Sequence, residues 1–130
     1  MNDEAAKERL RSFLEGLHLL TQFQDCKVID VNTRGSTGDA PLKVAVVRED
    51  LTAVKDLLNA GADPNIQGED EWTPLHHAAS TGNPEIIQLL LVRGASTRIK
   101  DFEGVTPVEI ARIMRNNAAL ALLEASTSLD

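Results

Sequence analysis

A four-residue motif recurs along this chain at a fixed spacing. The first residues of its copies are 33 apart in both steps, and the copies are Ala40-Pro41-Leu42-Lys43, Thr73-Pro74-Leu75-His76 and Thr106-Pro107-Val108-Glu109. Such a regular spacing indicates one supersecondary unit copied along the chain. Because a unit of this size cannot bury its apolar face alone, the copies must stack on one another. The sequence therefore predicts a stacked array whose function lies on its surface.

Each motif begins a stretch with helical apolar spacing, and a second helix follows it. Residues suited to the first position of that helix recur at the same spacing: Asp50, Asn83 and Asn116. Gly61 and Gly94 end the second helices, because glycine readily takes the left-handed conformation needed there. Leucine pairs are expected in the core of these helices: Leu57-Leu58, Leu122-Leu123 and, for the middle copy, Leu89-Leu90 or, in the count that keeps the step, Leu90-Leu91.

Both ends of the array are expected to be caps. Residues 5–20 place Leu10, Phe13, Leu14 and Leu17 on one helical face, and residues 28–32 repeat the loop of residues 61–65. At the other end, Arg112 and Arg115 interrupt the apolar pattern. We expect one domain, residues 1–130, made of a degenerate N-terminal cap repeat 1–39, repeats 40–72 and 73–105, and a C-terminal cap repeat 106–130.

Residues 68–101 resemble a near-consensus ankyrin repeat, and the resemblance extends over roughly residues 30–125. It rests on Thr73-Pro74-Leu75-His76, Ala78-Ala79, Gly82-Asn83, Glu85-Ile86-Ile87, Leu89-Leu90-Leu91 and Gly94-Ala95. The resemblance implies an all-α, ankyrin-like helical solenoid of about four repeats, including degenerate N- and C-terminal caps. It also implies finger-like loops, and protein binding through these fingers and the inner helices. We expect a small stand-alone ankyrin protein of bacterial type.

No group of residues predicts catalysis. His76 and His77 are adjacent, so on a helix they point about 100° apart, and no third partner gives zinc-type spacing. No serine lies in a nucleophile elbow, and the glycine-rich stretch at residues 35–38 lacks the lysine of a phosphate loop. By the resemblance, His76 ties a loop to its neighbour, whereas for His77 packing and partner contact both stay open. We expect no enzyme, no metal and no cofactor.

Compartment signals are few. The chain starts with charged residues and has no apolar leader, and no run approaches the length of a membrane span. Cys26 is the single cysteine and has no partner for an internal disulfide. A net charge of −7 disfavours direct contact with nucleic acid. We expect a cytoplasmic protein, monomeric on its own, that contacts neither nucleic acid nor membrane directly.

Acidic residues are concentrated in one repeat. Residues 40–72 hold seven acids and three bases, whereas residues 73–105 hold three of each. By the ankyrin register Glu69-Asp70-Glu71 forms a finger tip, and Glu71 stands where Gly104 stands in the next finger. A solvated surface is the alternative, but replacement of a turn glycine by a charge favours a role in binding. Together with Glu49 and Asp50 these residues are expected to form one acidic patch that steers a basic protein partner.

Trp72 and Phe102 are expected to supply the apolar centre of this surface, with packing of Trp72 against its finger as the alternative. Ile113 and Met114 occupy inner-helix surface positions, but as apolar residues they are equally compatible with packing in the C-terminal cap. The predicted partner-binding residues are Glu49, Glu69, Asp70, Glu71, Trp72, His77, Ser80, Thr81, Phe102 and Glu103.

Two uses of such a module remain open. In one, the chain is an inhibitor, such as the immunity protein of a toxin–antitoxin system, that blocks a basic partner. In the other, it is an adaptor or regulatory subunit of a larger assembly. The concentrated acidity favours the inhibitor. Acidity of this kind is not specific to inhibitors, so the adaptor stays open.

Overall fold

The computed structural model describes residues 3–129. In this range it has seven α-helices, three short 3-10 helices and no strand, so the all-α prediction is confirmed. The α-helices are α1 (Asp3–Gly16), α2 (Pro41–Val47), α3 (Leu51–Asn59), α4 (Pro74–Thr81), α5 (Pro84–Val92), α6 (Pro107–Ile113) and α7 (Asn117–Leu129); the 3-10 helices are η1 (Leu17–Leu19), η2 (Thr21–Phe23) and η3 (Glu69–Glu71).

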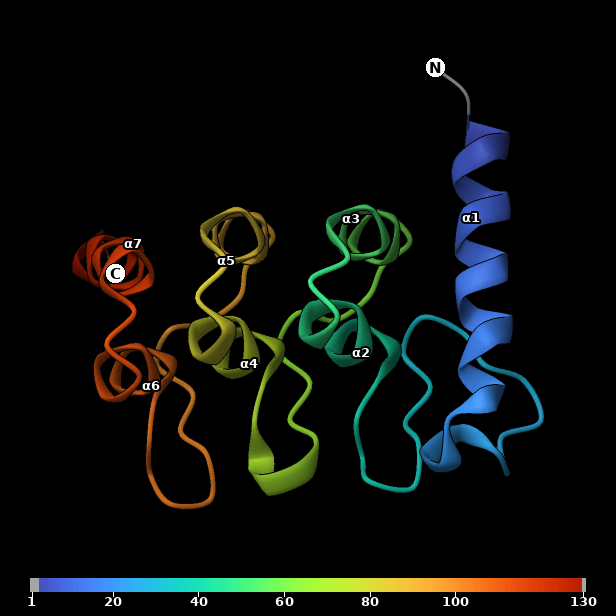
Figure 1. Cartoon of the computed structure of the whole chain (residues 1–130), viewed down its shortest axis with the longest axis horizontal. Coiled ribbons are helices and arrows are strands. Elements are labelled where there is room, and N and C mark those ends of the chain that lie inside the picture. Colours follow the sequence, from blue (N-terminus) through green and yellow to red (C-terminus); the bar gives the residue numbers. More distant parts are fainter. Residues whose placement is uncertain (1–2, 130) are drawn as a thin grey trace.

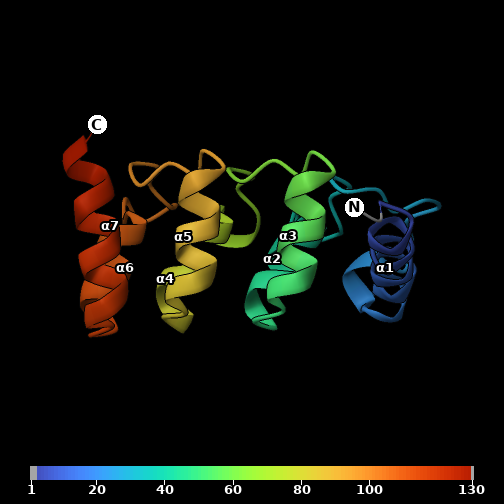
Figure 2. The same cartoon turned by 90° about the horizontal axis from the view of Figure 1, so that it is seen from above.

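Helices α2 to α7 form two parallel layers (Figure 1). The inner layer is α2, α4 and α6, and the outer layer is α3, α5 and α7; each helix packs on its own partner and on the next helix of its layer. The loops before α2, α4 and α6 project side by side from one end of the inner helices. We call these loops fingers 1, 2 and 3. Helix α1 crosses the direction of the others and closes one end of the stack (Figure 2).

The helix ends follow the predicted signals. The side chains of Asp50 and Asn83 accept hydrogen bonds from the first backbone N–H groups of α3 and α5. Gly61 and Gly94 have φ of 97° and 93°, in the left-handed region that ends these helices. The side chain of Asn116 reaches across to the preceding repeat, where its amide donates to the carbonyl oxygens of Ala79 and Ser80.

One leucine column runs through the core of the outer layer. Leu57, Leu90 and Leu123 are each 0% exposed and occupy the same position in successive repeats. Leu89 is half-buried, so the count that begins with Leu90 is the correct one for the middle copy. Full burial of this column explains why isolated repeats do not fold and why neighbouring repeats stabilise one another.

The N-terminal segment closes the stack with one long helix. Leu10, Phe13 and Leu14 of α1 pack against the core, as predicted, and Leu17 is fully buried in a second cluster with Phe23. Cys26 is half-buried against this second cluster. Arg9 anchors α1 on α3, because its guanidinium donates to both carboxylate oxygens of Asp56 at 3.0 and 3.1 Å.

The loop after α1 joins the array in the same way as its successors. The Asn32 side chain accepts from the Asp63 N–H and donates to the Gly61 carbonyl oxygen. Asn65, at the same position one repeat later, makes the same two bonds with Ser96 and Gly94. On the basis of this equivalence, we propose that residues 1–39 are a degenerate repeat.

Candidate protein-binding surface

The fingers are tied to one another by hydrogen bonds at matching positions. Arg34 of finger 1 donates to the Gln67 carbonyl oxygen, and the Gln67 side chain donates to that of Lys100 in finger 3. At the tips, the Phe102 N–H donates to the Asp70 carbonyl oxygen at 3.1 Å. These bonds make the three fingers one continuous surface with a fixed shape.

The tip of finger 2 has an unusual backbone. Asp70 and Glu71 have φ of 60° and 61°, whereas fingers 1 and 3 place Gly38 and Gly104 in the left-handed region, at 89° and 81°. A residue with a side chain costs about 1–2 kcal/mol in this conformation. Both carboxylates are exposed. Finger 2 therefore keeps a charged residue, Glu71, where its neighbours use glycine, and adds a second positive φ at Asp70, which supports a role for these charges outside folding.

Glu49 repeats this pattern at the other end of the inner layer. Its φ is 55°, and Gly82 occupies the corresponding position of the next repeat with φ of 79°. Glu49 follows the last turn of α2, whereas the fingers precede the first turns of the inner helices. The length of an inner helix, about 10 Å, separates the two ends. The expectation that Glu49 and Asp50 form one patch with the finger-2 tip is therefore wrong, and the acidic residues form two groups.

Trp72 lies at the base of finger 2 and is half-buried. Its indole Nε1–H donates to Asp101 of finger 3 at 2.9 Å. Burial raises the pKa of Asp101, but hydrogen bonds from the backbone of Val105 and Glu103 and from Trp72 outweigh it, so the pKa lies below its ordinary value. The His76 ring also stacks on the indole, with centroids 5.6 Å apart, so Trp72 is held between finger 3 and α4, and only part of its surface lines a pocket.

The two adjacent histidines have different surroundings. The His76 Nδ1 accepts from the Thr73 N–H, and its Nε2 lies 2.9 Å from the Val105 carbonyl oxygen, so the ring joins two fingers as the resemblance implies. The His77 ring packs edge-on to Trp72, with centroids 4.8 Å apart, and its buried Nε2 has no hydrogen-bond partner among the described residues. Burial, and secondarily the charge of Lys43, lower the His77 pKa to about 4, so the ring is neutral near pH 7.

A pocket of about 220 Å³ lies between the base of finger 2 and the inner helices α2 and α4. Its lining combines four of the predicted partner-binding residues, Glu69, Asp70, Trp72 and His77, with Asp39 and Lys43. By the ankyrin register Asp39 was expected at a variable finger surface position, whereas Lys43 was not predicted as a site residue. Asp39 is buried and pairs with Lys43 at 3.6 Å. The repeat register connects Asp39 with the site, because Asp39 stands one repeat before Trp72, at the equivalent position.

Four further predicted residues do not line this pocket. Phe102 is 63% exposed and Glu103 is exposed in finger 3, while Thr81 is exposed and Ser80 half-buried on α4. Ile113 and Met114 are 68% and 51% exposed, so they do not pack in the C-terminal cap. They extend the inner-helix surface, and Val47 and Ile113 flank Ser80 at the equivalent positions of the neighbouring repeats.

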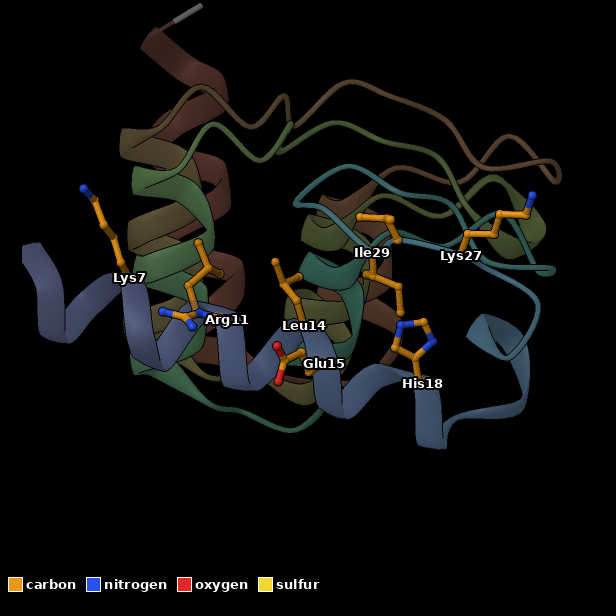
Figure 3. Close-up of a pocket in the computed structure, with 9 residues that line it drawn as sticks. Lys7, Arg11, Leu14, Glu15, His18, Lys27 and Ile29 are labelled. Atoms are coloured by element: carbon orange, nitrogen blue, oxygen red, sulfur yellow. The ribbon is translucent and has the colours of Figure 1, made fainter.

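A larger hollow lies elsewhere, along α1 at the N-terminal end (Figure 3). It has a volume of about 450 Å³, a floor that includes Leu14 and Ile29, and a rim with Lys7 and Lys27. Size alone does not make it the better candidate, because its rim charges are partly matched by their helix neighbours, as in the Lys7–Glu4 pair. The pocket at finger 2 is smaller but combines an indole, free carboxylates and an unsatisfied ring nitrogen.

Metal and membrane sites have no support in the described part of the chain. Across residues 3–129, no three histidine, cysteine or acidic side chains lie close enough together to hold a metal ion. None of the helices in that range has the length and apolar character required to cross a bilayer.

Comparison with known proteins defines the class. A family model described as ankyrin repeats, in three copies, matches residues 42–130. The chain belongs to the ankyrin-repeat family and carries a non-catalytic protein–protein interaction module of that family.

The similar curated proteins are much larger than this chain. Dog inversin (Canis lupus familiaris) is 40% identical over 86 residues, which is 66% of this chain and 8% of inversin. Human 2-5A-dependent ribonuclease is 41% identical over 70 residues, 53% of this chain and 9% of that protein. Mouse ankyrin repeat and SOCS box protein 16 is 37% identical over 90 residues, 63% of this chain and 20% of that protein. All three come from animals, so the expected bacterial type gains no support from them.

Proposed function

We propose that this module binds a basic protein through the fingers and the inner-helix surface, with the tip of finger 2 as the centre of the contact. The carrying observation is the backbone of that tip, where Glu71 holds an exposed carboxylate in the left-handed conformation that Gly38 and Gly104 take at the same position of the neighbouring fingers, and Asp70 beside it has a positive φ as well. Strain of this kind persists where it serves a function. The half-buried Trp72 and the exposed Phe102 supply apolar contact area beside the charges.

The test is a comparison of two charge-reversed variants on an affinity column. One carries Glu69→Lys, Asp70→Lys and Glu71→Lys; the control carries Glu8→Lys, Glu15→Lys and Glu85→Lys, which are exposed on α1 and α5 and lie off the finger surface. The finger variant should release the basic protein that the wild type retains at moderate salt, whereas the control should retain it. Equal retention by the wild type and both variants would contradict the proposal.

Two uses of this contact are compatible with the surface. The relatives embed their repeats in much larger proteins, which favours an adaptor or regulatory subunit. The acidic tip, placed over a basic active site, would exclude an anionic substrate, which favours an inhibitor such as an immunity protein. Adding the module in stoichiometric amount to the captured partner separates them: an inhibitor abolishes the partner's activity, and an adaptor leaves it intact.

A further inference from the structure

The pocket at the base of finger 2 breaks the pattern of the array at two positions. His77 stands midway between Val44 and Ile110 in the repeat register, and these are buried apolar residues of the equivalent helices. A ring nitrogen that is buried without a partner costs about 1–3 kcal/mol. An apolar side chain would fill the same position without that cost. The stack alone therefore does not explain His77.

Asp39 is the second exception. It occupies the register position of Trp72 and Val105, yet it is 2% exposed and its Oδ1 accepts from the Glu69 N–H at 3.2 Å. A Cβ on Gly68 would lie 1.8 Å from the same Oδ1, so the carboxylate fills the space that glycine leaves. This contact holds the tip of finger 2 against the start of α2. The tip carboxylates thereby form a rim around the pocket.

The charge in the pocket favours a cation. Lys43 is paired with Asp39 at 3.6 Å, so these two charges largely offset one another. Within residues 3–129, the carboxylates of Glu69 and Asp70 take part in no ion pair. The pocket therefore keeps two uncompensated negative charges beside the indole of Trp72. Cations are stabilised both by carboxylates and by the face of an indole ring.

We propose that this pocket is a subsite for one arginine side chain of the protein partner. The guanidinium lies against Trp72 and donates to the carboxylates of Glu69 and Asp70, beside the ring of His77. Arginine fits better than lysine because its planar group stacks on an aromatic ring and presents five donors in a fixed geometry. The neutral state of His77 near pH 7 adds no positive charge to the pocket. The inference rests on the proposed function, because it names the partner group that the surface takes.

Trp72 is the only tryptophan in the chain, so its fluorescence reports on the pocket directly. The probes are three blocked tripeptides, acetyl-Gly-X-Gly-amide, with arginine, lysine or citrulline at X. The arginine peptide should change the Trp72 emission in a saturable manner, with a Kd on the order of 1 mM, the affinity of a single weak contact. The lysine peptide should bind several-fold more weakly, and neutral citrulline should show no saturation.

Two variants localise the binding. Glu69→Gln with Asp70→Asn, and separately His77→Val, should each weaken arginine-peptide binding by about tenfold, the equivalent of 1.4 kcal/mol. Glu85→Gln removes an exposed charge on α5 that does not line the pocket and should leave the Kd unchanged. Circular dichroism confirms that each variant is folded.

The outcomes separate this inference from the proposed function. No saturable change with the arginine peptide, equal binding of citrulline or lysine, or an unchanged Kd in the two pocket variants overturns the arginine subsite. Column retention of a partner that depends on the finger-2 charges would still support the proposed function in those cases. Conversely, arginine-peptide binding without any retained partner would leave the subsite standing and refute the partner contact.

Discussion

At the scale of single residues, His77 couples the stability of the module to pH. Its pKa in the folded protein is about 4, lowered first by burial and then by Lys43, against 6.5 for the exposed side chain. Between these values the unfolded chain binds the proton more readily than the folded one. The neutral ring therefore contributes its full stability above about pH 6.5, and this contribution is lost as the pH falls towards 4.

We expect this loss to be measurable with His77→Val. On lowering the pH from 7.5 to 5.0, the free energy of unfolding of the wild type should fall by up to about 2 kcal/mol more than that of the variant. Urea melts at both pH values give the comparison. Burial also lowers the pKa of His76, but His76 is present in both proteins, so it does not affect the difference. The exposed His18→Val variant is the control and should behave like the wild type; parallel losses in wild type and His77→Val would contradict the assignment.

The left-handed backbone of Glu71 could be read from the sequence, because Gly104 occupies the same register and such glycines mark the need for positive φ. The same φ at Asp70 could not, since no neighbouring finger carries a glycine at that position. Nor could the orphaned Nε2 of His77, which depends on how Trp72 and α2 pack around the ring. Conformation marked by a register glycine was predictable here, as was the His76 bridge that the resemblance implies, whereas the packing around His77 was not.

At the scale of elements, the helix caps and stops were predictable because they depend on residues within one turn. Asp50, Asn83, Gly61 and Gly94 all act as expected. The path of α1 was not predictable, since residues 17–40 contain no helix pattern that continues the repeat. One feature of the sequence did indicate where α1 packs. Asp56 occupies the register of Leu89 and Leu122, so α3 faces a neighbour there that differs from the neighbours of α5 and α7.

Arg9 on α1 is that neighbour, and its removal tests how the cap is held. Asp56 is 8% exposed, so Arg9→Ala leaves a nearly buried carboxylate without its cation. We expect this variant to lose measurable stability, more than Arg11→Ala loses. Arg11→Ala, which breaks the exposed pair with Glu8, should lose less than about 1 kcal/mol.

A double replacement separates the charge from the packing. Arg9→Leu with Asp56→Leu should recover part of the loss, because it also removes the nearly buried carboxylate that Arg9→Ala leaves without its cation. Urea melts measure all four proteins. Equal stability of Arg9→Ala and the wild type would show that solvent replaces Arg9 at no cost and that α1 is held by its apolar face alone.

At the scale of the whole molecule, the repeating core was predictable and the site only in part. The step of 33 placed the repeats and their helices, and the resemblance to ankyrin repeats placed the fingers, the inner-helix surface and the acidic tip of finger 2. Neither placed the pocket, since Asp39 and Lys43 come from the copy whose motif is least regular. The sequence analysis also placed Glu49 in one acidic patch with the finger-2 tip. A count of charges per repeat does not distinguish the two ends of an inner helix.

The order of the array predicts that identical core substitutions differ in their effect. Leu90 and Leu123 are both 0% exposed, but Leu90 lies between two neighbouring repeats and Leu123 lies in the last helix. In a linear array, stability is a sum of terms for each repeat and each interface between neighbours. Leu90→Ala should weaken the whole array, and Leu123→Ala should uncouple its last repeat. Each cavity should cost about 2–5 kcal/mol at its site.

Two probes in one urea melt distinguish these cases. Circular dichroism reports on all helices, whereas the fluorescence of Trp72 reports on the repeat around finger 2. For Leu90→Ala the two curves should coincide at a lower midpoint, because the repeat of α5 and the repeats on both sides of it unfold together. For Leu123→Ala the dichroism should begin to fall before the fluorescence, as α6 and α7 unfold first. The exposed Val92→Ala should melt like the wild type in both probes. Coincident curves for Leu123→Ala would mean that the module unfolds as a single unit whose ends are as tightly coupled as its centre.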